Sequence, residues 1–154
     1  MAGSWPLARA NIVTQLNGIT FDAGASYASE TLKALEYPPS SFQTSIIPYC
    51  YVIPPARTIR RANGKLRITS FEDGARVHFV LGGAGAELEA VATRMEALAE
   101  AIATAFDDAL ALDGNADFAS RQEIGELDTF GPDQHWGFDL TIPLRVSEEK
   151  TIGA

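Results

Sequence analysis

The chain has 154 residues, of which 46% are hydrophobic and 21% are charged, and its net charge is −8. A chain of this size builds one core of ordinary proportions, so the sequence predicts a single domain over residues 1–154. No apolar run is long enough for a membrane span and no secretion signal opens the chain, so we expect cytoplasmic synthesis and no membrane partner. Cys50 is the single cysteine, which excludes an intrachain disulfide and favours a buried, inert thiol.

The charge is distributed unevenly along the chain. Residues 1–85 contain eight Lys/Arg and five Asp/Glu, a balance of +3, whereas residues 86–154 contain four and fifteen, a balance of −11. A molecule polarised in this way can pack head to tail with copies of itself, and an ordinary solvated acidic surface is the alternative. The overall acidity disfavours a dedicated nucleic-acid binder.

The first third predicts a short helix, an irregular stretch and a strand. Residues 5–19 have helical spacing, with Ser4 as the N-cap and Pro6 in the first turn. Residues 20–44 are weakly patterned, and we expect at most one or two helical turns there, over residues 27–35. Residues 45–53 are rich in β-branched and aromatic side chains and predict a strand at a sheet edge or bulge.

A basic hairpin is predicted next. Five cations fall within eleven residues that contain no acid: Arg57, Arg60, Arg61, Lys65 and Arg67. Asn63-Gly64 is a strong hairpin-turn signal, so residues 65–71 form the return strand, and a further strand over residues 75–81 completes a meander. The arm favours an acidic protein partner, since stacking aromatics are missing, and a solvated basic loop is the alternative.

The clearest helix is predicted over residues 86–112, where apolar side chains recur at steps of three and four. Two strands follow over residues 119–130 and 136–146, joined by the turn Gly131-Pro132-Asp133, and the second alternates apolar and polar residues. Residues 147–154 are polar and predict a flexible C-terminal tail. The fold class is therefore α+β: a mainly antiparallel sheet of four to five strands, one long helix across one face, a shorter N-terminal helix and a protruding hairpin.

No catalytic, cofactor or metal constellation is evident. Gly82-Gly83-Ala84-Gly85 matches no phosphate loop, so a plain strand-to-helix turn is favoured over a ligand-binding or enzymatic cleft. His78 and His135 lack the spacing of metal ligands, and we interpret them as a cross-strand polar residue and a surface turn residue. We therefore predict a protein that is not an enzyme and has no cofactor.

The order of elements resembles a known family. The opening helix Leu7-Ala8-Arg9-Ala10-Asn11-Ile12-Val13-Thr14-Gln15-Leu16 is followed by strands, of which one ends Phe79-Val80-Leu81 before the long helix. The chain closes with Trp136-Gly137-Phe138-Asp139-Leu140-Thr141-Ile142-Pro143-Leu144-Arg145-Val146. This arrangement is similar to the tail terminator family of long-tailed bacteriophages and gene-transfer particles.

The resemblance implies a virion protein of the phage tail or neck, assembled in the bacterial host cytoplasm. Members form hexameric rings that cap the head-proximal end of the tail tube and contact tail tube protein and a head-completion or stopper protein, while DNA only passes through the lumen. It makes the basic hairpin a subunit or tube contact. It also implies an acidic lumen or partner face, represented by Glu96, Glu100, Asp107 and Asp108. A neck stopper or head-completion protein is the alternative, and an enzyme or ligand-binding domain using the Gly82-Gly85 turn is a further one.

Overall fold

The computed structural model describes residues 4–22, 29–62, 64–71, 74–107, 122–142 and 146–152. Within these ranges the chain forms two helices and eleven strands in three sheets. The elements are α1 (Trp5–Leu16), β1 (Thr20–Asp22), β2 (Ser29–Thr31), β3 (Lys33–Leu35), β4 (Tyr49–Ile53), β5 (Thr58–Ala62), β6 (Leu66–Phe71), β7 (Ala75–Gly82), α2 (Leu88–Ala105), β8 (Glu123–Ile124), β9 (Asp128–Phe130), β10 (His135–Ile142) and β11 (Val146–Thr151).

The central sheet has the strand order β3-β4-β7-β10-β8, and β9 also pairs with β10. All its pairs are antiparallel except β3–β4, which is parallel. Alternate residues of β7 and β10 form its apolar face, where the rings of Phe79 and Phe138 stack 4.6 Å apart. The opposite face of the same strands carries polar side chains, including His78 and Asp139.

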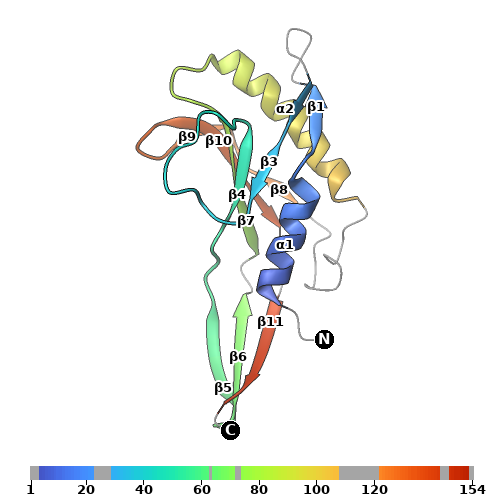
Figure 1. The fold of residues 1–154 in the computed structure, drawn as a ribbon, viewed down its shortest axis with the longest axis vertical. Coiled ribbons are helices and arrows are strands. Elements are labelled where there is room, and N and C mark those ends of the chain that lie inside the picture. Colours follow the sequence, from blue (N-terminus) through green and yellow to red (C-terminus); the bar gives the residue numbers. More distant parts are fainter. Residues whose placement is uncertain are drawn as a thin grey trace.

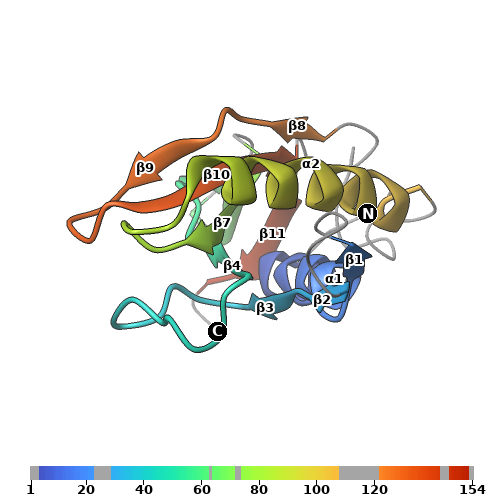
Figure 2. The same cartoon turned by 90° about the horizontal axis from the view of Figure 1, so that it is seen from above.

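Both helices bury an apolar stripe in the core on the apolar face of the central sheet. On α1 the buried residues recur every three or four positions, as Trp5, Ala8, Ile12 and Leu16. Figure 2 shows α2 running alongside β10 and β7. Its buried residues are Val91, Leu98 and Ile102, and Phe106 joins the same cluster at its C-terminal cap. The helices thereby close one side of the sheet.

The helix α2 is shorter than the predicted 86–112. It starts at Leu88 and ends at Ala105, because Phe106 leaves the helical conformation with φ −97° and ψ 1°. Consecutive aspartates at 107 and 108 oppose extension at the negative end of the helix dipole. The predicted stop at Asp113-Gly114-Asn115 lies outside the described residues.

Strands β5, β6 and β11 form a separate antiparallel sheet in the order β11-β6-β5. Figure 1 shows this sheet extending from one end of the molecule, away from α2 and the central sheet. With six residues, β6 is about 20 Å long. We call this three-stranded sheet the arm, and the rest of the described chain the body.

The predicted single sheet of four to five strands is wrong, because the structure divides eleven strands among a central sheet, the arm and the pair β1–β2. The predicted meander is also wrong: β6 pairs with β5 and β11, whereas β7 pairs with β4 and β10. The chain changes sheets between β6 and β7, where Gly74 has a φ of +84°. The predicted basic hairpin is confirmed as β5–β6.

Two further sequence predictions are corrected by strands. Residues 27–35 form no helical turn where they are described; they supply β2, which pairs with β1, and β3, which pairs in parallel with β4. The predicted flexible tail forms most of β11, which pairs with β6 along its whole length. Both segments are short or polar, so the alternation that marks a half-buried strand is missing from them.

Candidate functional site

The root of the arm is fixed to α1. The rings of Trp5 and Phe71 stack with centroids 5.6 Å apart, and the Arg57 guanidinium lies 5.3 Å from the Phe71 ring centroid. The backbone N–H of Trp5 donates to a Glu148 carboxylate oxygen at 2.6 Å. The sequence predicts Ser4 as the helix cap, but its side chain makes no cap hydrogen bond, and the Glu148 carboxylate from β11 serves the helix N-terminus instead.

Beyond this root the outer strand β5 and the end of β11 are exposed, whereas β6 between them is half-buried. Four of the five residues of β5 are exposed, and Ile59 is 50% exposed. Arg67 on β6 lies directly opposite Arg61 on β5 and Lys150 on β11, so three cations cross one face of the arm in a row. Like charges opposite one another destabilise a sheet, and among the described residues no salt bridge offsets this row.

The five cations singled out from the sequence therefore occupy different places. Arg57 lies at the root, on the Phe71 ring, and Lys65 lies in the exposed turn between β5 and β6. Arg61 and Arg67 share one face of the arm, whereas Arg60 points to the other face because side chains alternate along a strand. The cations of the hairpin are clustered in the sequence, but in the structure they do not share one face of the arm.

The acidic residues singled out from the sequence lie on the body, away from the arm. Glu96, Glu100 and Asp107 are all exposed. Their spacing of four and seven residues places them on the outer side of α2 and at its C-terminal end, and exposed Glu89 continues the stripe. Asp108 lies outside the described residues. The structure thus does not bring this acidic face beside the basic arm of the same chain.

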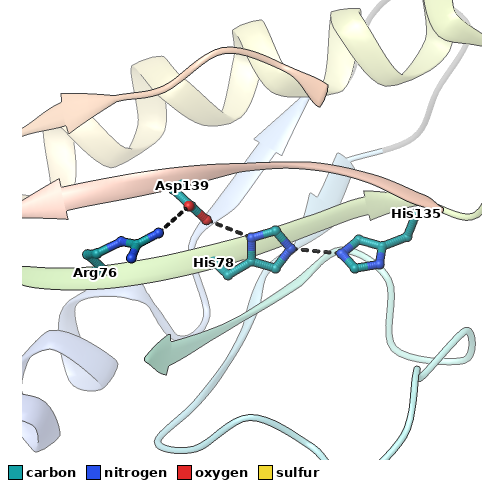
Figure 3. A network of polar contacts seen from close by, with 4 residues as sticks. All are labelled: Arg76, His78, His135 and Asp139. Atoms are coloured by element: carbon teal, nitrogen blue, oxygen red, sulfur yellow. Dashed lines mark hydrogen bonds and ion pairs between the residues drawn. The ribbon is translucent and has the colours of Figure 1, made fainter. Parts of the chain in front are cut away.

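A chain of hydrogen bonds joins two buried histidines on the polar face of the central sheet (Figure 3). His78 Nδ1 lies 2.7 Å from Asp139 Oδ1, and His78 Nε2 lies 2.8 Å from His135 Nε2. His135 Nδ1 is 2.7 Å from Asp133 Oδ1, and Arg76 donates to Asp139 Oδ2 at 3.0 Å. This network links β7, β10 and the turn before β10.

The network is complete with three ring protons. Each Nδ1 faces a carboxylate and so donates its proton, while between the two Nε2 atoms one must donate and the other accept. Two neutral imidazoles would leave one of these bonds unmade, and a fourth proton would set two N–H groups against each other. All four ring nitrogens therefore have hydrogen-bond partners within the chain.

Burial and hydrogen bonding set the protonation of this network. Burial lowers the pKa of His78, in spite of the opposing effect of Asp139. The hydrogen bond with His135 lowers the pKa of Asp133. The first shift favours the neutral imidazole of His78, and the second favours the ionised carboxylate of Asp133.

The sequence interpretation of these histidines is half right. His78 does lie across the strands from Asp139 and Tyr51. His135 is not a surface residue, because its exposed fraction is 7% and its ring stacks on Phe42 with centroids 5.4 Å apart. Fifty-seven residues separate the pair, and only the register of β7 against β10 brings them together.

The hollows on the described part of the molecule include two that lie near residues discussed above. One of about 280 Å³ is bordered by His135, Asp133, Tyr51 and Phe42, and one of about 390 Å³ lies beyond the end of α1. Neither includes the Gly82-Gly85 turn. A Cβ on Gly82 would lie 2.9 Å from the Ala86 Cβ, so close packing of β7 against the start of α2 accounts for this glycine.

Three further observations concern the described ranges. No helix in them is long and apolar enough to cross a membrane. No group of three or more His, Cys, Asp or Glu side chains there could hold a metal ion. Cys50 is a buried free thiol, as the sequence predicts, and burial raises its pKa. In comparisons with known proteins, the chain matches no family model and no curated protein.

Proposed function

We propose that this chain is a structural virion protein, a ring-forming tail terminator that caps the head-proximal end of a phage tail tube and joins it to the head or neck. The observation that carries the proposal is the arm, whose outer strand β5 is largely exposed and whose row of three cations has no salt bridge to the described residues. An exposed edge strand is a template for pairing with another chain. The proposal also rests on the resemblance of the element order to that family.

The placement of the acidic residues fits a ring through which DNA passes. Glu89, Glu96, Glu100 and Asp107 form one exposed stripe on and just beyond α2. Carboxylates repel the phosphate backbone, so a lumen lined by this stripe lets DNA slide without binding. The basic arm lies away from α2 (Figure 1) and is free to contact a neighbouring subunit or the tube.

Electron microscopy with tail tubes tests the proposal. Purified protein is mixed with growing tail tubes, and the tubes are imaged by negative staining. We expect rings at one end of each tube and tubes that stop lengthening. A protein that stays monomeric by light scattering and leaves tube length unchanged would contradict the proposal. Binding to DNA-filled heads but not to tubes would instead identify a neck stopper or head-completion protein.

A further inference from the structure

The arm has two open edges. In the order β11-β6-β5, the strand β6 is paired on both sides, whereas β5 and β11 are each paired on one side only. Within the described ranges no other strand pairs with the outer edge of either (Figure 1). Strand edges carry unpaired N–H and C=O groups, so both edges can accept a further strand.

The two edges differ in the sign of their charge. Arg60 and Arg61 give β5 a charge of +2. Glu148, Glu149 and Lys150 give β11 a charge of −1, from two acids and one base. Arg60, Arg61 and Glu149 are exposed, and none has a salt-bridge partner among the described residues. The edges are therefore complementary to each other rather than to themselves.

This difference selects the symmetry of association. Pairing β5 of one copy with β5 of another would place the arginines of both strands together, which like-charge repulsion opposes. Pairing the basic edge with the acidic edge brings opposite charges together. Such a contact uses different surfaces on the two copies, so it is head to tail, and head-to-tail contacts form a ring when the rotation between copies closes and an open filament when it does not.

We propose that arms of neighbouring copies join edge to edge, with β5 of one copy beside β11 of the next, into one continuous sheet. This joint would be the contact between subunits of the proposed ring, so the inference rests on the proposed function. Because β5 and β11 are both antiparallel to β6, they run in the same direction, and the new pair is parallel in a sheet that simply repeats.

The register within the arm places the charges for this joint. Arg60 and Glu149 both lie opposite Ile68, so they point to the same face. If the rows of the arm continue unshifted into the next copy, Glu149 lies beside Arg60 of that copy, but Lys150 then lies beside its Arg61. A shift of two residues also preserves the faces, moves Lys150 away from Arg61 and places Arg61 beside Glu148, whose carboxylate also accepts from the Trp5 N–H. Each of these registers brings an arginine next to a carboxylate.

A mixing experiment with charge reversals tests the joint. In one variant Arg60→Glu and Arg61→Glu make the β5 edge acidic, and in the other Glu149→Arg makes the β11 edge basic. In each variant alone, β5 and β11 carry net charges of the same sign, so we expect self-association to weaken at least tenfold. Mass photometry and light scattering measure this loss. An equimolar mixture restores opposite edges in alternating copies, and we expect assemblies of the wild-type size.

The matched control is Glu96→Arg, which reverses an exposed carboxylate on α2 and should leave self-association unchanged. Circular dichroism confirms that every variant is folded. If wild-type protein forms rings and the two edge variants do so equally well, the joint is wrong and the proposed function stands. If the mixture restores assembly but neither protein caps tail tubes, the joint stands and the proposed function fails. Wild-type protein that stays monomeric even with tubes overturns both.

Discussion

The body and the arm differ in whether their charged side chains have ion-pair partners. In the body, Asp139 accepts hydrogen bonds from both Arg76 and His78, and Arg94 is paired with Glu30 across α2 and β2 at 3.0 Å. In the arm, three cations share a row, and no salt bridge neutralises them within the described residues. The difference supports our proposal that the arm binds a second molecule, because these ion pairs of the body are made within the chain.

The largest effect is expected where the body is packed most tightly. A Cβ on Gly137 would lie 2.1 Å from the Phe79 carbonyl oxygen and 3.3 Å from His78 Cε1, beside a register irregularity of β10. Gly137→Ala must displace the backbone of β7, so we expect a loss of more than about 3 kcal/mol of unfolding free energy. Gly85→Ala is the control, since nothing lies within 4 Å of its Cβ. Urea unfolding measures both, and equal midpoints would contradict this packing.

A pair of apolar truncations compares the two regions directly. Leu98 is completely buried between α2 and the sheet, whereas Ile59 on the arm is 50% exposed. We expect Leu98→Ala to cost about 3 kcal/mol because it leaves a cavity. Ile59→Ala should change the unfolding free energy of the monomer by less than about 0.5 kcal/mol. Chemical denaturation below the concentration of self-association measures both, and a cost at Ile59 similar to that at Leu98 would mean that the arm is part of the core.

Acid should act on the stability of the body through His78. Because the folded pKa of His78 is lowered, the unfolded chain binds this proton first, and stability falls as pH drops below about 6.5. The slope from this group is at most about 1.4 kcal/mol per pH unit. Asp133 adds a second loss of stability as pH falls below about 4, because its pKa in the folded chain is also lowered.

Denaturation curves at a series of pH values measure this dependence. His78→Gln retains an amide that can donate but removes the titrating ring, so it should flatten the slope between pH 7 and 5. Asp133→Asn should flatten only the slope below pH 4. A wild-type slope that His78→Gln leaves unchanged would mean that other groups produce the acid sensitivity.

The smallest expected changes in unfolding free energy have opposite signs in the arm and in the body. Arg67→Gln removes the middle cation of the row formed with Arg61 and Lys150, so it should raise the unfolding free energy by about 0.2–0.5 kcal/mol. Arg76→Gln removes an exposed ion pair with Asp139, so this substitution should lower the unfolding free energy by a similar amount. Thermal unfolding of the monomer resolves both signs. Destabilisation by Arg67→Gln would indicate that its charge already has a partner within the chain.

Local patterns predict local structure well in this chain. The stripes of α1 and α2, the β5–β6 hairpin and the β9–β10 hairpin can all be read from periodicity and turn residues. Strand partners are a non-local choice, which is why the partition into separate sheets is not evident in the sequence. The polar strand β11 is least predictable. Only Val146 in it is buried, so its sequence lacks the apolar residues that mark a strand.

The candidate sites show the same division. The cluster of arm cations is visible in the sequence, but their separation onto two faces and the contribution of Lys150 depend on the register with β11. The histidine network depends on the alignment of Asp139 with His78 in β10 and β7. Composition reveals which charges are available, and only the pairing of strands reveals which of them meet.

Hydrogen–deuterium exchange across the assembly range tests the central claim most directly, namely that the arm edges bind other copies. As protein concentration rises or tail tubes are added, amides of β5 and β11 should exchange at least tenfold more slowly, while those of α1 and α2 keep their rates. Assemblies in which the exchange rates of β5 and β11 match those of the dilute monomer would contradict the account.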